Sequence, residues 1–268
     1  MKNTVEKAAQ AADAGMIGRL MFRLLPIQVM LCVVGSINGF VSSYFASNYI
    51  SVEAMGAVGL FGPLSMLVGA VSLMLTGGAS ILCGKYMGQN AGEKMQNVYC
   101  VSVSFSGLVA LFFTAVFALM GVFDITGFLT RDEVVRPLLD QYLLGQAIGV
   151  LPLVLGNQLA AFLFIENRSR LTVIGSLANI AVNTALNLLF VLKLRMGAFG
   201  LALSNALGLW AALLVQAWPF VSGASHFHFR LGGMRWKECG EILKIGTPGA
   251  LSNGYQTIRG LLVNEMIV

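Results

Sequence analysis

Three asparagines spaced four residues apart stand in the middle of a long apolar stretch. Asn179, Asn183 and Asn187 lie within residues 171–192, which contain no charged residue. At about 100° per residue, side chains four apart share one slowly rotating face of a helix. A carboxamide is costly in hydrocarbon unless it is paired or hydrated. This face is therefore expected to look into a bundle or a cavity, and both interhelical hydrogen bonding and a cavity lining stay open.

The composition places this stretch in a membrane protein. Of the 268 residues, 57% are hydrophobic and only 11% are charged, whereas soluble domains carry about 25% charged residues. The net charge of +5 does not indicate nucleic acid, because the cationic residues fall in short segments between apolar spans. We predict an all-α, polytopic membrane helix bundle surrounded by lipid, with no nucleic-acid partner.

Six apolar spans and a seventh candidate follow one another along the chain. They cover residues 24–47, 57–83, 98–121, 141–165, 171–192, 199–222 and 246–268. About twenty apolar residues suffice for a helix to cross the bilayer core. The chain then divides into an N-terminal segment (1–23), a six-helix transmembrane lobe (24–222), a basic loop (223–245) and the start of a second lobe (246–268).

Lys and Arg are unevenly distributed between the two sides that these spans define. Twelve of them fall on the side of the N-terminus, against four on the opposite side. Cytoplasmic loops of membrane proteins are enriched in Lys and Arg. We therefore predict a multi-pass protein of the cell membrane with a cytoplasmic N-terminus.

Further polar side chains occur in the first and fourth spans. Asn38 and Ser42 are four residues apart and share a helix face, which we expect to form one polar wall with the asparagine face. Asn157 follows Pro152 in the fourth span, where a kink frees backbone carbonyls. The alternative is that these groups serve helix packing or bond back to their own helix.

The sequence contains no pattern typical of a catalytic or metal site. No paired carboxylates, Ser/His/Asp arrangement or phosphate-binding loop occurs, and the four cysteines form no CxxC pair. We therefore expect no enzyme, no metal site and no cofactor. His226 and His228 lie in the basic loop, which we interpret as a solvated segment facing acidic headgroups.

Short motifs along nearly the whole chain resemble the multidrug and toxic compound extrusion (MATE) family. They occupy Val41–Ser47, Glu53–Pro63, Gly77–Lys94, Glu166–Arg170, Asn183–Gly200 and Lys244–Pro248. The resemblance implies a twelve-helix exporter made of two six-helix lobes. It also implies antiport of cationic or amphipathic small molecules against H⁺ or Na⁺. This chain then corresponds to the first lobe and the start of the seventh helix, with a second lobe or another copy of itself as its partner.

Two residues depart from the family pattern. An acidic residue of the family's first helix falls on Ser42, and one of its fifth helix falls on Asn187. Neither side chain titrates, so we predict that this lobe has no proton site of its own. Two other functions stay open. A lipid-linked saccharide flippase of the same superfamily is disfavoured because no basic residue lies mid-span, and a non-transporting remnant or subunit is the third possibility.

Overall fold

The protein is an all-α helix bundle, which confirms the predicted fold class. The computed structural model describes residues 2–123, 125–128, 130, 132–229 and 236–267, and side chains at 22, 25–123, 125–127, 130, 132–229, 236–251, 254 and 255. The described residues form α1 (Lys2–Phe45), α2 (Val52–Gly88), α3 (Gly92–Val122), α4 (Val135–Ile165), α5 (Ser169–Asn187), α6 (Gly197–Val221) and α7 (Lys237–Ile267). Three short helices, η1 (Ala46–Ile50), η2 (Ile125–Phe128) and η3 (Leu188–Lys193), complete them, and no strand occurs among these residues.

In the described part of the chain, six helices are long and apolar enough to cross a membrane. They span Leu25–Ile50, Val52–Gly88, Gly92–Val122, Val135–Ile165, Ser169–Lys193 and Gly197–Val221. These helices correspond to the six predicted spans, and the protein is a multi-pass membrane protein. Over its described residues, α7 is not among the helices that are long and apolar enough to cross a membrane.

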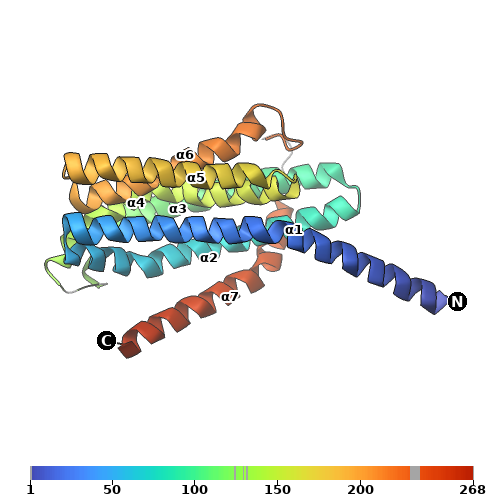
Figure 1. Ribbon diagram of the computed structural model, residues 1–268, viewed down its shortest axis with the longest axis horizontal. Coiled ribbons are helices and arrows are strands. Elements are labelled where there is room, and N and C mark those ends of the chain that lie inside the picture. Colours follow the sequence, from blue (N-terminus) through green and yellow to red (C-terminus); the bar gives the residue numbers. More distant parts are fainter. Residues whose placement is uncertain (1, 124, 129, 131, 230–235, 268) are drawn as a thin grey trace.

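The six helices lie side by side, and both terminal helices project from the bundle (Figure 1). The first part of α1 extends beyond one end of the bundle. The helix α7 begins near this same end, leaves the bundle and runs in the direction of the opposite end. The helix α1 packs mainly on α5, whereas α4 contacts α2, α3 and α6. Because half of the most apolar window of α4 and of α6 is buried, against 6% in α1, α4 and α6 form the centre of the lobe.

A side-chain hydrogen bond caps α2, and a hydrogen-bonded aspartate precedes α4. The Ser51 hydroxyl accepts a hydrogen bond from the Ala54 amide at 3.1 Å and caps α2. At the start of α4, the Asp132 carboxylate accepts from the Val134 amide at 2.8 Å. Such caps satisfy amides that have no partner within the helix. The helix α4 itself starts at Val135, before the predicted span at 141, and its N-cap residue Val134 makes no side-chain cap.

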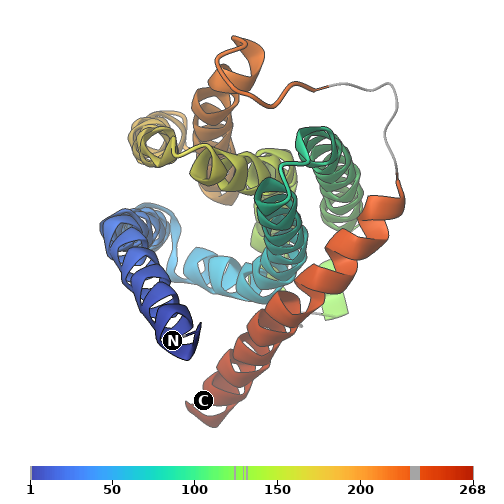
Figure 2. The same ribbon diagram turned by 90° about the vertical axis from the view of Figure 1, so that its right-hand side faces the viewer.

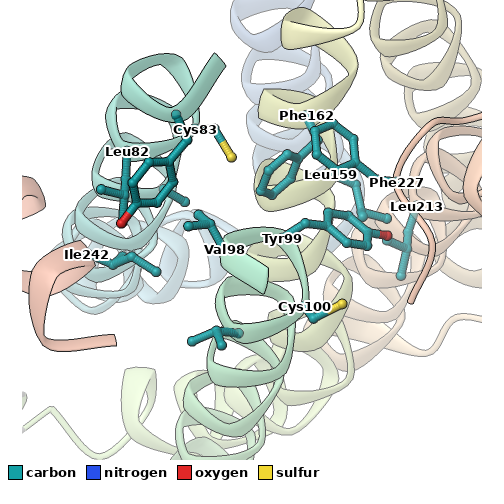
Figure 3. Packing of buried hydrophobic residues seen from close by; sticks show 13 residues of the cluster. Leu82, Cys83, Val98, Tyr99, Cys100, Leu159, Phe162, Leu213, Phe227 and Ile242 are labelled. Carbon is teal, nitrogen blue, oxygen red and sulfur yellow. The ribbon is translucent and has the colours of Figure 1, made fainter. Parts of the chain in front are cut away.

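The connection between α6 and α7 folds back onto the bundle. We call residues 222–229 the strap. The Phe227 side chain is 4% exposed and lies in an aromatic cluster with Tyr99 of α3 and Phe162 of α4 (Figure 3). Both ring centroids lie 5.2 Å from that of Phe227. The interpretation of this loop as solvated is therefore wrong at Phe227, although the flanking histidines are exposed.

Hydrogen bonds from three helix ends hold the strap in place. Glu166 Oε1 at the end of α4 accepts from the Ser225 hydroxyl at 2.7 Å and from the His226 amide at 2.8 Å. The Gln96 carboxamide pairs with both backbone groups of His228. The Arg168 guanidinium donates to the Ala224 carbonyl at 2.6 Å. The strap is thus a folded part of the lobe.

The helix α7 begins at Lys237, earlier than the predicted start at 246. Its first half crosses α2, as the end-on view shows (Figure 2). A side chain at Gly78 would meet the Ile242 carbonyl, and one at Gly246 would meet the Met74 carbonyl. Because glycines allow the two backbones to approach closely and Ile242 is buried, the end of the predicted basic loop is helical and packed.

Candidate binding site

Hydrogen bonds between asparagines connect α5 with α1. Asn183 Nδ2 donates to Asn38 Oδ1 at 2.6 Å, and Asn187 Nδ2 donates to Asn183 Oδ1 at 3.2 Å. Asn183 and Asn187 are completely buried. The asparagine face of α5 therefore points into the lobe, and its spacing of four residues allows one carboxamide to bond to the next.

The same line of hydrogen bonds continues into α6 and α4. Asn38 Nδ2 donates to Asn205 Oδ1 at 3.3 Å, and Asn205 Nδ2 donates to Gln146 Oε1 at 3.4 Å. Gln146 Nε2 then donates to the Tyr142 hydroxyl at 3.0 Å. We call this set the amide chain. Its members, in order, are Asn187, Asn183, Asn38, Asn205, Gln146 and Tyr142.

The amide chain has a direction, because each carboxamide accepts from one neighbour and donates to the next. At one end, Asn187 Oδ1 is buried and has no donor among the described residues. A π-helical turn, η3, begins directly after this residue, and such turns are frequent at functional sites. At the other end, the Tyr142 oxygen accepts a bond, so the hydroxyl proton remains for another partner.

One cavity borders this chain and is lined by α1, α2, α3, α4 and α6. Its volume is about 360 Å³, and we call it the first cavity. The polar side chains in its wall are Asn38, Ser42, Ser43, Ser65, Tyr142, Gln146 and Asn205. Phe61 and Phe117 contribute aromatic surface. The first cavity thus combines apolar walls with a few hydrogen-bonding groups, as small-molecule sites do.

A second cavity lies between α1, α2, α4, α5 and α6 and has a volume of about 590 Å³. Asn38 lines both cavities, so the two meet at one residue of the amide chain. Asn157 Nδ2 donates to the Ser72 hydroxyl at 3.2 Å in this wall. The wall also includes Thr172, Asn179 and Gln216, each with a buried side-chain oxygen that lacks a partner among the described residues.

Among the described residues, no charged side chain lies in the wall of either cavity. Hydroxyls and carboxamides donate and accept hydrogen bonds but do not change charge in the accessible pH range. Within the described residues, no group of three or more His, Cys, Asp or Glu side chains could hold a metal ion. The arrangement is therefore suited to hydrogen bonding with a small organic molecule.

The structure brings the six candidate residues into one region in different roles. Asn38, Asn183 and Asn187 belong to the amide chain, and Ser42 lines the first cavity. Asn157 and Asn179 line the second cavity. The sequence interpretation did not single out three further residues of the chain: Tyr142, Gln146 and Asn205. The only sequence indication was the spacing of four between Tyr142 and Gln146, and the polar Asn205 within the sixth span.

Comparison with known proteins identifies similar sequences and folds. The MatE family model matches residues 26–189. A probable multidrug resistance protein NorM of Bacillus licheniformis is 28% identical over 138 residues, which cover 48% of this chain and 30% of the relative. The corresponding protein of Bacillus subtilis is 26% identical over 141 residues, or 50% of this chain and 31% of the relative.

The solved structures show the same fold. An outward-facing multidrug resistance MATE family transporter has a TM-score of 0.81 at 21% identity, covering 91% of this chain and 55% of that chain. A MOP superfamily transporter from Pyrococcus furiosus has a TM-score of 0.81 at 20% identity, with 91% and 54% covered. This chain therefore spans about half the length of those structures, and its match covers less than a third of the Bacillus relatives.

Proposed function

The chain belongs to the MatE family, and from this we propose that it supplies one six-helix lobe of an exporter of cationic or amphipathic small molecules. The main support for this proposal is the pair of cavities that meet at Asn38, in a lobe built from six membrane-spanning helices. Their volumes fall within or near the range of about 300–1,000 Å³ common for small-molecule sites. The similarity to probable multidrug resistance proteins supports the same assignment.

Export by alternating access requires two bodies that move against each other around a site. We propose that the second body is another six-helix lobe, or else a second copy of this chain. The open wall between α1 and α2 supports this, because the second cavity is lined by both helices although they make little direct contact. In this arrangement the two cavities face the partner and are closed by it.

The proposed energy source is antiport against H⁺ or Na⁺. A proton site requires a group that changes charge, and a buried carboxylate with a raised pKa is the usual choice. Ser42 in the first cavity and Asn187 in the amide chain offer only neutral atoms. We therefore place the group that binds the coupling ion in the second lobe.

The alternatives make different demands on the cavities. A flippase for lipid-linked saccharides needs basic side chains for the phosphate groups of its substrate, and no described residue in either cavity wall is basic. This observation favours export of small organic molecules. A remnant or subunit without transport activity is distinguished by the transport assay below.

We further propose that the N-terminus lies in the cytoplasm of a cell-membrane protein. The exposed side chains of Lys94, in the first turn of α3, and Glu133, before α4, lie on opposite sides of the membrane in the predicted topology. In a background without native cysteines, Glu133→Cys should react with an impermeant maleimide in intact cells. Lys94→Cys should react only after permeabilisation, and the reverse pattern would contradict the orientation.

A fusion tests the proposed function directly. The chain is joined to the second lobe of the Bacillus licheniformis relative and expressed in a host that lacks its own dye pumps. We expect extrusion of ethidium by the fusion and none by this chain as a proven monomer, because one lobe closes only half of the site. Failure of a membrane-inserted fusion to extrude ethidium would overturn the proposal.

Matched asparagine variants identify the site within that fusion. Asn38→Leu removes the carboxamide shared by both cavities and should reduce ethidium extrusion at least tenfold. Asn48→Leu makes the same change in η1, where the side chain bonds only to Tyr44 and Ser47 outside the cavities. Equal extrusion by the two variants would show that the cavities are not the transport path.

A further inference from the structure

All five hydrogen bonds of the amide chain point in the same direction, from Asn187 toward Tyr142. Their donors and acceptors belong to four different helices, α5, α1, α6 and α4. Hydrogen bonds in series polarise one another in a low-dielectric interior. The Tyr142 hydroxyl is the last group of the series, so the polarisation by all five bonds adds up there. This polarisation makes the hydroxyl a stronger hydrogen-bond donor than an isolated phenol.

The position of Tyr142 directs this donor into the first cavity. Its side chain is 5% exposed and lines the cavity wall. The ring packs edge-on against Phe61 with centroids 5.3 Å apart, which restricts its rotation. Gln146 Nε2 already occupies the acceptor side of the hydroxyl. Among the described residues, no hydrogen bond takes the remaining hydroxyl proton, so an acceptor within the cavity is its available partner.

We propose that the Tyr142 hydroxyl is a specificity-determining donor that binds an uncharged hydrogen-bond acceptor of the exported compound, such as a ketone, ester or amide oxygen. This inference rests on the proposed function, which places the exported compound in the first cavity. The amide chain acts as a positioning element, because it holds the tyrosine oxygen as an acceptor and leaves the proton for the ligand.

The neutral wall of the cavity selects an uncharged acceptor over an anion. A carboxylate or phosphate removed from water needs a cation or several donors to compensate for its lost hydration. No Lys, Arg or His in the described part of the chain lines the first cavity. A carbonyl oxygen loses much less on desolvation, and one hydrogen bond from Tyr142 compensates for it. The remainder of the ligand then packs on Phe61 and Phe117.

A pair of small probes that differ in one atom position tests this inference. Acetophenone carries a carbonyl oxygen, and α-methylstyrene carries a methylene group in its place on the same planar frame. Binding of each to the full chain in lipid nanodiscs is measured by equilibrium dialysis, with empty nanodiscs as the blank. We expect wild type to prefer the ketone and Tyr142→Phe to weaken ketone binding about five- to tenfold. The affinity for the hydrocarbon should not change.

Two further variants separate a specific role from general damage. Tyr99→Phe removes the hydroxyl of another buried tyrosine, in the aromatic cluster below the strap, and should leave the preference for the ketone intact. Gln146→Met removes the donor that orients Tyr142 and should reduce the preference about two- to threefold. An unchanged preference in Gln146→Met would overturn the role assigned to the amide chain.

The inference is overturned if Tyr142→Phe keeps the full ketone preference, or if neither probe binds wild type above the empty nanodiscs. Its failure is distinguishable from failure of the proposed function, because ethidium extrusion by the fusion is measured separately. Extrusion without a ketone preference contradicts only the role of Tyr142. A ketone preference that depends on Tyr142, without extrusion, contradicts only the exporter.

Discussion

Phe227→Ala is expected to release the strap from the end of the bundle. The Phe227 ring fills a site between Tyr99 and Phe162, and it is the largest apolar group that the strap buries. Truncating a buried phenylalanine costs about 3–5 kcal/mol. Since 1.4 kcal/mol is a factor of ten, hydrogen exchange at the His226 and His228 amides should accelerate by roughly a hundredfold or more.

Phe229→Ala is the matched control for this experiment. Phe229 lies two residues further along the same strap and its side chain is 49% exposed. Its truncation should change exchange at the two amides less than about threefold, because surface substitutions rarely exceed 0.5 kcal/mol. If both variants exchanged at the wild-type rate, the bonds from Glu166 and Gln96 alone would hold the strap.

The strap also shows where prediction from sequence stops. Phe227 stands between two histidines in a basic segment, and nothing within the loop indicates burial. Its site is formed by Tyr99 and Phe162, which belong to two other helices and are far from Phe227 in the sequence. Local polarity predicts solvation correctly for His226 and His228, whereas burial of the residue between them depends on tertiary packing.

The six spans were predictable because each depends on a local property. A run of about twenty apolar residues must form a helix in lipid, where every backbone group needs a partner within its own segment. Helix ends were predicted less well, because they depend on caps and contacts. A turn bonded to Asp132 precedes α4, which begins at Val135, and α7 begins at Lys237, before its close crossing of α2 at Gly246.

The candidate site also has a part that local sequence predicts and a part that depends on contacts between helices. The spacing of Asn183 and Asn187 predicts a shared face, and the structure shows the bond between them. The hydrogen bond between Asn38 and Asn205 forms only if α1 and α6 are placed so that these two residues lie at the same level in the bundle. The spacing of residues within either helix does not predict that placement. The sequence therefore does not identify a site residue such as Asn205, which has no second member of the amide chain on its own helix.

Asn183→Leu is expected to destabilise the lobe more than any other single change in the amide chain. Asn183 is fully buried, donates to Asn38 Oδ1 and accepts from Asn187 Nδ2. Leucine has a similar size but leaves both of these partners without a hydrogen bond. An unpaired buried polar group costs about 1–3 kcal/mol, which applies in full to the buried Asn187 amide and in part to Asn38, because Asn38 is half-buried and lines both cavities. The unfolding midpoint in detergent should fall by roughly 10 °C.

Asn157→Leu provides the comparison for this prediction. Its side chain makes one hydrogen bond, to Ser72, at the wall of the second cavity and is exposed rather than buried. Water in the cavity can replace the lost bond, so the unfolding midpoint should fall by less than about 3 °C. A midpoint for Asn183→Leu that stays within this smaller range would show that its partners find other donors and acceptors, and that the amide chain does not hold α1 against α5.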